Sequence, residues 1–140
     1  MFNEKKLNKF VGQMLSDLGG ASSIAMVRMG DGLGLYKALQ DGGATTCAAL
    51  AERTKVDNRY LREWLSHQAA SGYLEYDAQS ATFSLPPEQA MVFAVEDSPV
   101  YMMGAFDFMV AMVENQAKVQ KAFRTGNGVA WGDQAGCMFC

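Results

Sequence analysis

"NRYLREWLSHQAASGYLEYD", from Asn58 to Asp77, is the stretch of sequence that decides the fold. Its apolar residues recur four positions apart, which is the spacing of one face of an α-helix: Leu61, Leu65 and Ala69. Gly72 is a typical helix stop, and the residues after it alternate as a β-strand does. We therefore expect a helix from Asn58 to Ser71 that leads directly into a short strand.

The segments on either side complete a small motif. "ATFSL" follows the first strand across Ala78-Gln79-Ser80, which predicts a β-hairpin. On the other side, "CAALAERT" predicts a short helix capped by Thr45 or Thr46, because a threonine hydroxyl can accept a free backbone N–H. A turn at Lys55-Val56-Asp57 separates this helix from the one that begins at Asn58.

Two further helices precede this motif. The first is expected from Glu4 to about Met29, with a bend at Gly19 and Gly20. Its apolar face holds Leu7, Val11, Met14, Leu15, Leu18, Ala25 and Met29. The second should run from about Leu33 to Gln40 and end at Asp41-Gly42-Gly43, which is a strong turn signal.

After the hairpin, Pro86-Pro87 predicts the start of a short helix to about Val95. Asp97-Ser98-Pro99 then opens a long apolar helix that is expected to continue to about Phe123. The residues from Arg124 to Cys140 are predicted to be Gly-rich coil.

The order helix, helix, turn, helix, hairpin predicts a winged helix-turn-helix. The fold class is therefore mainly α with a small β-hairpin, flanked by long N- and C-terminal helices, in one domain of residues 1–140 that ends in a linker at about 125–140. Six apolar residues have the spacing that packs crossed helices onto a small sheet: Leu50, Ala51, Val56, Leu61, Leu65 and Leu74.

Charge argues against a DNA reader. Such proteins neutralise phosphates with Lys and Arg, but the candidate recognition helix offers only Arg59 and Arg62, with Glu63 beside them. Residues 73–98 hold five acidic side chains and no basic one, so the wing would repel the DNA backbone. Tyr60 and Trp64 are expected to pack rather than to contact bases. Nucleic acid is accordingly a disfavoured partner, and Arg59 and Arg62 are DNA contacts only if the alternative holds.

The stretch "IAMVRMGDGLGLYKAL" contains Gly30-x-Gly32-x-Gly34, which imitates a nucleotide-binding loop. That interpretation requires alternating strands and helices, which do not follow, so we interpret these glycines as the break between two helices. Cys137 and Cys140 have CxxC spacing, but zinc needs two more ligands and the only histidine, His67, lies within a predicted helix. No catalytic residue and no metal site is predicted.

Composition indicates the kind of surface and the cellular compartment to expect. Ten methionines among 140 residues suit adaptable apolar surfaces. Three cysteines and the lack of a basic-then-apolar leader predict a cytoplasmic protein without disulfides. The apolar run from Val100 to Val113 is interrupted by Asp107 and is too short to cross a membrane.

Several segments resemble, in order, the N-terminal region of a family of bacterial S-adenosylmethionine-dependent class I methyltransferases: "LGLYKAL", "RYLREWL", "AASGYLEYD", "FSLPPE" and "FRTGNGVAWGD". The resemblance spans about residues 30–134. It implies a winged-helix module that mediates dimerisation and roofs a substrate cavity, while the catalytic domain with its cofactor loop lies beyond the point corresponding to Cys140. S-adenosylmethionine is thus implied for the full-length family and no cofactor for this chain.

The resemblance leaves four candidates for the substrate cavity: Met103, Phe106, Met109 and Trp131. Each is equally compatible with the hydrophobic core or a dimer interface. Three hypotheses follow: an accessory domain of a methyltransferase, a DNA-binding regulator, and a free-standing dimer that encloses a small apolar ligand. We expect a homodimer, because the two long apolar helices carry more hydrophobic surface than the motif can cover.

Overall fold

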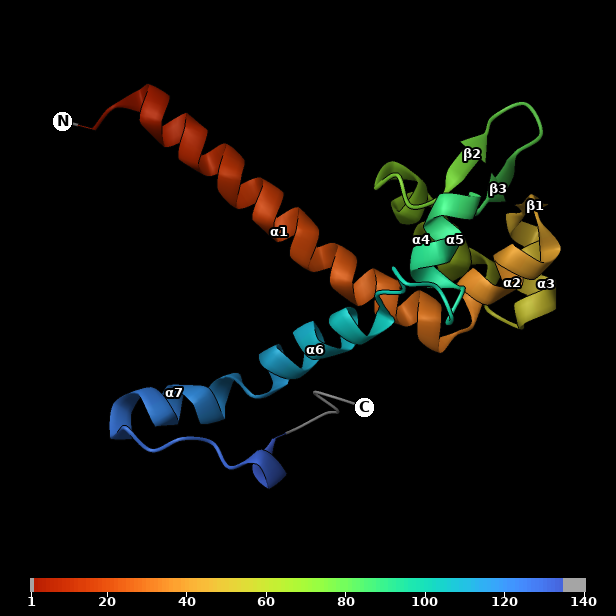
Figure 1. The fold of residues 1–140 in the computed structure, drawn as a ribbon. Coiled ribbons are helices and arrows are strands. Elements are labelled where there is room, and N and C mark those ends of the chain that lie inside the picture. The colour runs from red at the N-terminus through yellow and green to blue at the C-terminus, as the bar shows by residue number, and fades with distance from the viewer. Residues whose placement is uncertain (1, 135–140) are drawn as a thin grey trace.

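The computed structural model describes residues 2–134, which form a mostly helical molecule with one small antiparallel sheet (Figure 1). The helices are α1 (Glu4–Gly32), α2 (Leu35–Gly42), α3 (Cys47–Thr54), α4 (Asn58–Ala70), α5 (Pro87–Phe93), α6 (Met103–Glu114), α7 (Gln116–Thr125) and the short 3-10 helix η1 (Trp131–Asp133). The strands are β1 (Thr45–Thr46), β2 (Glu75–Asp77) and β3 (Thr82–Ser84), in the order β1-β3-β2. Helices α2 to α5 and the sheet make a winged body, from which α1 and the α6–α7 pair extend (Figure 1).

Side-chain caps start the two helices of the helix-turn-helix where the sequence predicts. The Thr46 hydroxyl accepts a 3.3 Å hydrogen bond from the backbone N–H of Ala49. One carboxylate oxygen of Asp57 accepts from the N–H groups of Arg59 and Tyr60, at 3.0 and 3.2 Å. Each cap satisfies backbone donors that have no partner within the helix, so α3 and α4 begin at defined residues.

The Gly-rich stretch forms the break between α1 and α2. Gly34 has a φ of 66°, a left-handed conformation that glycine adopts without steric cost. Its N–H donates to the carbonyl of Asp31 at 2.8 Å, which closes the last turn of α1. The interpretation of these glycines as a helix break is confirmed. Helix α1 itself continues without interruption through Gly19 and Gly20.

The predicted hairpin is the wing, with Tyr76 opposite Phe83 and their ring centroids 4.7 Å apart. Asp77 organises its turn by accepting from the Ser80 hydroxyl at 2.5 Å and from the N–H of Gln79 at 2.9 Å. Strand β1 was not predicted. It has only two residues, too few for any alternation to be visible, and it exists because its backbone pairs with β3.

The core lies where helices α1 to α5 meet the sheet. Its buried residues are Val27, Leu35, Tyr36, Leu39, Leu50, Ala51, Leu61, Trp64, Leu65, Leu74, Phe83, Phe93 and Met103. Five of the six predicted core residues are among them, and the sixth, Val56, is partly buried against the cluster. Inside it, the Tyr36 hydroxyl donates a 2.7 Å hydrogen bond to the buried Gln68 side-chain oxygen. The predicted packing of the winged body is thus confirmed.

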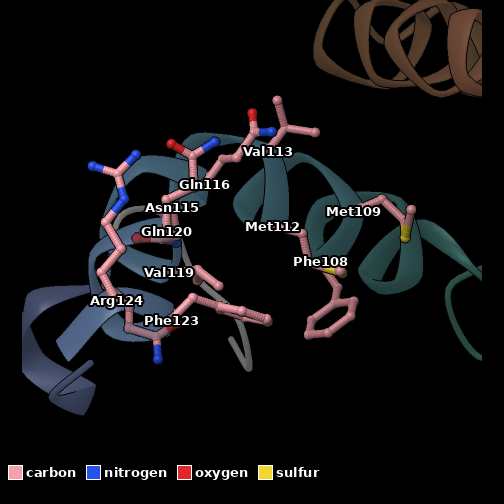
Figure 2. A pocket seen from close by; sticks show the side chains of 11 residues that line it. Phe108, Met109, Met112, Val113, Asn115, Gln116, Val119, Gln120, Phe123 and Arg124 are labelled. Carbon is pink, nitrogen blue, oxygen red and sulfur yellow. The ribbon is translucent and has the colours of Figure 1, made fainter. Parts of the chain in front are cut away.

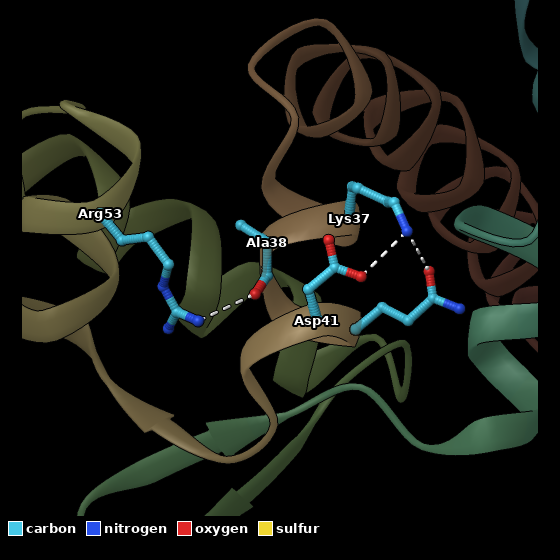
Figure 3. A network of polar contacts seen from close by, with 5 residues as sticks. Lys37, Ala38, Asp41 and Arg53 are labelled. Atoms are coloured by element: carbon cyan, nitrogen blue, oxygen red, sulfur yellow. Dashed lines mark hydrogen bonds and ion pairs between the residues drawn. The ribbon is translucent and has the colours of Figure 1, made fainter.

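A polar network holds α2 and α3 beside the sheet (Figure 3). The Arg53 guanidinium donates to the carbonyl of Ala38 at 3.1 Å and to the Thr45 hydroxyl at 3.2 Å. On α2, the ammonium group of Lys37 pairs with the carboxylate of Asp41 at 2.9 Å. These two basic side chains therefore already have partners within the winged body.

One packing prediction on α4 holds and one is wrong. Trp64 is buried, and its indole N–H donates to the carbonyl of Met26 at 2.8 Å. Tyr60 is instead 71% exposed, because it lies in the first turn of α4, to the side of the buried stripe that Leu61 and Trp64 belong to. Its ring contacts the Arg59 guanidinium, 5.8 Å from the ring centroid.

The predicted long helix from Pro99 to Phe123 is wrong in two respects. Residues 98–102 are not helical: the Val100 N–H bonds the Ser98 hydroxyl at 3.2 Å, and the Met102 N–H bonds the carbonyl of Val92 at 3.1 Å. These donors are committed to a turn and to α5, so the helix begins only at Met103. It is then divided at Asn115 into α6 and α7.

The C-terminal coil also starts later than predicted. Helix α7 continues through Arg124 to Thr125, and Trp131–Asp133 forms η1. The remainder of the predicted linker, residues 135–140, lies outside the described residues together with the CxxC pair.

Helix α1 is present as predicted, but most of its apolar face does not meet the winged body. Every residue from 2 to 22 is exposed, and the buried positions of α1 are Ser23, Val27 and Gly30 near its end. That end also joins α6 through an ion pair of 2.7 Å between Arg28 and Asp107. Within residues 2–134, no helix has both the length and the apolar character that crossing a membrane requires.

Candidate functional site

A hollow of about 890 Å³ lies where α6 meets α7. We call it the α6–α7 groove (Figure 2). Its apolar lining residues are Phe108, Met109, Met112, Val113, Val119 and Phe123, and its polar ones are Asn115, Gln116, Gln120, Arg124 and Gln134. The volume is in the range of small-molecule sites, which are mostly apolar with a few polar groups.

Asn115 creates the groove by dividing one helix into two. Its side-chain NH₂ donates to the carbonyl of Ala111 at 2.8 Å, and its own carbonyl accepts from the N–H groups of Lys118 and Val119 at 3.0 and 3.1 Å. Asparagine side chains compete in this way with the regular backbone ladder. The result is two helical segments that meet at an angle (Figure 1), and side chains from both line the space between them (Figure 2).

The lining of the groove favours an apolar ligand with few polar substituents. The ring of Phe123 extends from α7 toward Phe108 and Met112 on α6, while Gln116, Gln120 and Arg124 project from α7 (Figure 2). Several of these apolar side chains are exposed, Phe123 to 88%. Arg124 is the one charged residue among those that line the groove in the described part of the chain.

The four cavity candidates from the sequence do not lie together. Met109 lines the groove. Met103 belongs to the buried core, and Phe106 is partly buried against it, with its ring 6.1 Å from that of Phe93. Trp131 lies in η1, is 68% exposed, and is not among the residues that line the groove. Contact of any of the four with a substrate stays a prediction.

Sequence reasoning missed most of the groove, including Phe108, Met112, Val119 and Phe123. The signal that could have found them is the polar pair Glu114-Asn115 within an otherwise apolar run. Asparagine is a weak helix former, and it marks the place where the two helices separate.

The DNA-contact candidates both lie exposed on α4. Arg59 contacts the ring of Tyr60, and Arg62 faces the wing beside Cys47. The wing remains acidic, because the Ser80 hydroxyl and the N–H of Gln79 lower the pKa of Asp77. Lys37 and Arg53 do not add positive charge to this face, since both are engaged elsewhere in the winged body (Figure 3).

Metal chemistry finds no support within residues 2–134, where no three His, Cys, Asp or Glu side chains come together as a metal site would require. Cys47 is a free thiol that donates to the side-chain oxygen of Asn58 at 3.2 Å. Burial raises the pKa of this thiol, although Arg62 lowers it in part. A neutral thiol of this kind is a poor nucleophile.

Three solved structures have a similar fold. PigF with SAH has 18% sequence identity and a TM-score of 0.64, and the match covers 94% of this chain and 39% of that one. The mitomycin 7-O-methyltransferase MmcR has 24% identity and a TM-score of 0.67, with 89% and 37% covered. The N,N-8-amino-8-demethyl-D-riboflavin dimethyltransferase RosA from Streptomyces davawensis has 24% identity and a TM-score of 0.67, with 86% and 34% covered. This chain thus spans less than two fifths of each of these proteins.

No curated protein sequence matches the chain significantly. The family model of the Rv2258c-like winged HTH domain matches residues 21–94, which is more than half of the chain and includes all of α2 to α5 and the sheet. The winged helix-turn-helix predicted from the sequence is thereby confirmed. The chain belongs to the family of Rv2258c-like winged helix-turn-helix domains.

Proposed function

We propose that this chain is the accessory domain of an S-adenosylmethionine-dependent methyltransferase, in which it joins two copies and forms one wall of the substrate cavity. One observation carries the proposal: 86 to 89% of this chain matches the fold of two proteins named as methyltransferases. The match covers only 34 to 37% of each of those proteins. A domain of that size beside a separate catalytic domain serves assembly and substrate enclosure rather than the chemistry itself.

Exposed apolar surface supports the role in assembly. Helix α1 carries large apolar side chains that are 37 to 66% exposed over its first five turns: Leu7, Phe10, Val11, Met14, Leu15 and Leu18. An apolar face of this length rarely stays bare in water, and most soluble homo-oligomers are two-fold dimers. We infer that a second copy covers α1.

The α6–α7 groove supports the role in substrate binding. It is apolar over most of its wall, and Gln116, Gln120 and Arg124 supply hydrogen-bond donors at one end. A small apolar molecule that carries oxygen acceptors would fit this distribution. Helices α6 and α7, which form the groove, lead out of the winged body toward the C-terminus (Figure 1). A catalytic domain that followed them in the chain would be well placed to close the groove.

The assembly role is tested by sedimentation equilibrium at micromolar concentration. We expect a species of about twice the 15.2 kDa chain mass. Leu15→Asp places a charge on the exposed apolar face of α1 and should give monomers with unchanged helix content. Gln13→Asp introduces a carboxylate two residues away and should leave the dimer intact. A monomeric wild-type chain would contradict the assembly role.

The cofactor is expected to need the catalytic domain. Titration calorimetry with S-adenosylmethionine should give no heat of binding with this chain alone, because no parallel sheet holds the Gly30–Gly34 segment as a cofactor loop among residues 2–134. One site per chain with a micromolar dissociation constant would refute this. An open reading frame after the codon for Cys140 that encodes a strand and a GxGxG loop would support the proposed parentage directly.

A further inference from the structure

A second cleft, separate from the α6–α7 groove, lies between α4 and the wing and has a volume of about 650 Å³. We call it the wing cleft. Its chemically distinctive lining residues are Thr46, Cys47, Arg62, Ser66, Tyr76 and Phe83. They come from β1, α3, α4 and both strands of the hairpin, so the cleft is assembled only by the folded winged body.

The wing provides an aromatic wall. Tyr76 and Phe83 face each other across the two strands, with centroids 4.7 Å apart and an interplanar angle of 38°. Phe83 is buried, whereas Tyr76 is 51% exposed and leaves much of its ring uncovered. A flat aromatic ligand can stack on such a surface at the offset geometry that aromatic pairs prefer.

The opposite side provides one positive charge. Arg62 is the charged residue among those that line the cleft in the described part of the chain, and no carboxylate of residues 2–134 lies within ion-pairing distance of it. Its neighbour Cys47 stays neutral at pH 7, because burial raises the pKa of the thiol. The guanidinium therefore has no ion-pair partner among the described residues, and a carboxylate is the group whose geometry it matches in two parallel hydrogen bonds.

From this arrangement we propose that the wing cleft binds a small aromatic monocarboxylate. The ring stacks on Tyr76 and Phe83, the carboxylate pairs with Arg62, and the hydroxyls of Thr46 and Ser66 donate hydrogen bonds to ligand oxygens. One guanidinium balances one negative charge, which favours a monoanion over a phosphate ester. The site occupies the face with which a winged helix would meet DNA. One arginine on α4 is enough to pair with one carboxylate, whereas DNA binding requires several phosphate contacts. The proposal is independent of the methyltransferase assignment.

The test uses 2-naphthoate as the probe and the whole chain, with ¹⁵N-labelled backbone amides followed by NMR. We expect saturable binding of one probe per chain, with shifts concentrated in α4 and the wing. The uncharged isostere 2-naphthamide and the non-aromatic cyclohexanecarboxylate should each bind roughly tenfold or more weakly, since each lacks one of the two recognition elements.

Matched variants locate the site. Arg62→Gln should weaken 2-naphthoate binding by about tenfold or more, whereas Arg59→Gln, on the same helix but outside the cleft, should change it by less than about twofold. Tyr76→Ala should likewise weaken binding, and Tyr60→Ala, an exposed tyrosine outside the cleft, should not. Circular dichroism establishes that each variant is folded, and the selectivity for naphthoate over naphthamide tests the charge without any substitution.

Four results would overturn the proposal: no saturable binding, equal affinity for the amide, an unaffected Arg62→Gln variant, or shifts confined to the α6–α7 groove. A fifth concerns nucleic acid. If a random-sequence duplex displaced the probe at about 50 mM salt and its binding required both Arg59 and Arg62, the cleft would belong to a DNA surface.

Discussion

A Cβ atom on Gly30 would lie 2.3 Å from Cζ2 of Trp64, so the indole of α4 rests directly on the backbone of α1. The same indole donates to the carbonyl of Met26 at 2.8 Å, which fixes the orientation of the ring. This contact attaches the long first helix to the winged body. It also explains why one glycine of the GxGxG stretch is needed for packing within a helix.

Gly30→Ala is therefore expected to destabilise the protein by about 1–3 kcal/mol, because the added methyl group overpacks a site whose indole cannot move away without losing its hydrogen bond. The free energy of unfolding from urea denaturation measures the effect. Gly20→Ala is the matched control in the same helix, where no heavy atom lies within 4 Å of the added Cβ. It should stabilise α1 by about 0.5–1 kcal/mol. A stabilising Gly30→Ala would contradict the packing described.

Removal of the Tyr36 hydroxyl should cost about 1–3 kcal/mol, because Tyr36→Phe leaves the buried Gln68 oxygen without its 2.7 Å donor. The comparison is made with the double variant Tyr36→Phe/Gln68→Met, in which both polar partners are replaced by apolar groups. Urea denaturation of the two single variants and the double variant should reveal strong non-additivity. Simple addition of the two single effects would show that the pair does not act as a unit.

Stability should fall at alkaline pH. Burial raises the pKa of Tyr36 above the ordinary tyrosine value near 10, and burial also raises the pKa of Tyr101. The folded state holds these protons more tightly than the unfolded state. The two protonated tyrosines therefore contribute fully to the free energy of unfolding below about pH 10, and this contribution is lost as the pH rises above that value. Unfolding free energies measured from about pH 8 to 11 should decline less steeply in Tyr36→Phe than in the wild type.

The ion pair between α1 and α6 should contribute little but measurably. Asp107→Asn removes the 2.7 Å contact with Arg28, and the expected cost is about 0.5–1 kcal/mol, because the Asp107 side chain is 43% exposed and screened by solvent. Arg28 keeps Asp31 as a partner at 2.5 Å. The difference from wild type in thermal or urea unfolding should shrink at about 1 M salt, where screening is strong. An effect that is unchanged by salt would indicate a packing change instead.

Specific binding of duplex DNA is not expected. A modest reader needs on the order of 6 phosphate contacts, and α4 offers Arg59 and Arg62 while the wing offers ionised Asp77. Fluorescence anisotropy at about 50 mM salt, where phosphate contacts count most, should show no saturable binding of a random duplex. Binding that disappears in an Arg59→Ala/Arg62→Ala double variant would refute this, as would recruitment of Lys5, Lys6 and Lys9 of α1 into a common basic face.

The sequence by itself determined the winged body, because the signals that specify it are local. Thr46 and Asp57 cap their helices within three residues, and Gly34 supplies the left-handed turn between α1 and α2. The four-residue spacing of Leu61 and Leu65 defines the buried face of α4. Each of these features is specified by neighbours that are close along the chain, so the order of the elements and most of the core could be predicted.

Only the tertiary structure decided which apolar faces are covered and where clefts form. The Met102 N–H is taken by Val92, which delays the start of α6, and the bonds of buried Asn115 divide α6 from α7. Arg62 and Tyr76 line the same wing cleft although they are fourteen positions apart in the sequence, and Tyr76 is held there by the pairing of β2 with β3. Periodicity assigns an apolar residue to a face of a helix, but whether another element lies on that face depends on contacts between residues distant in sequence, which a local pattern does not encode.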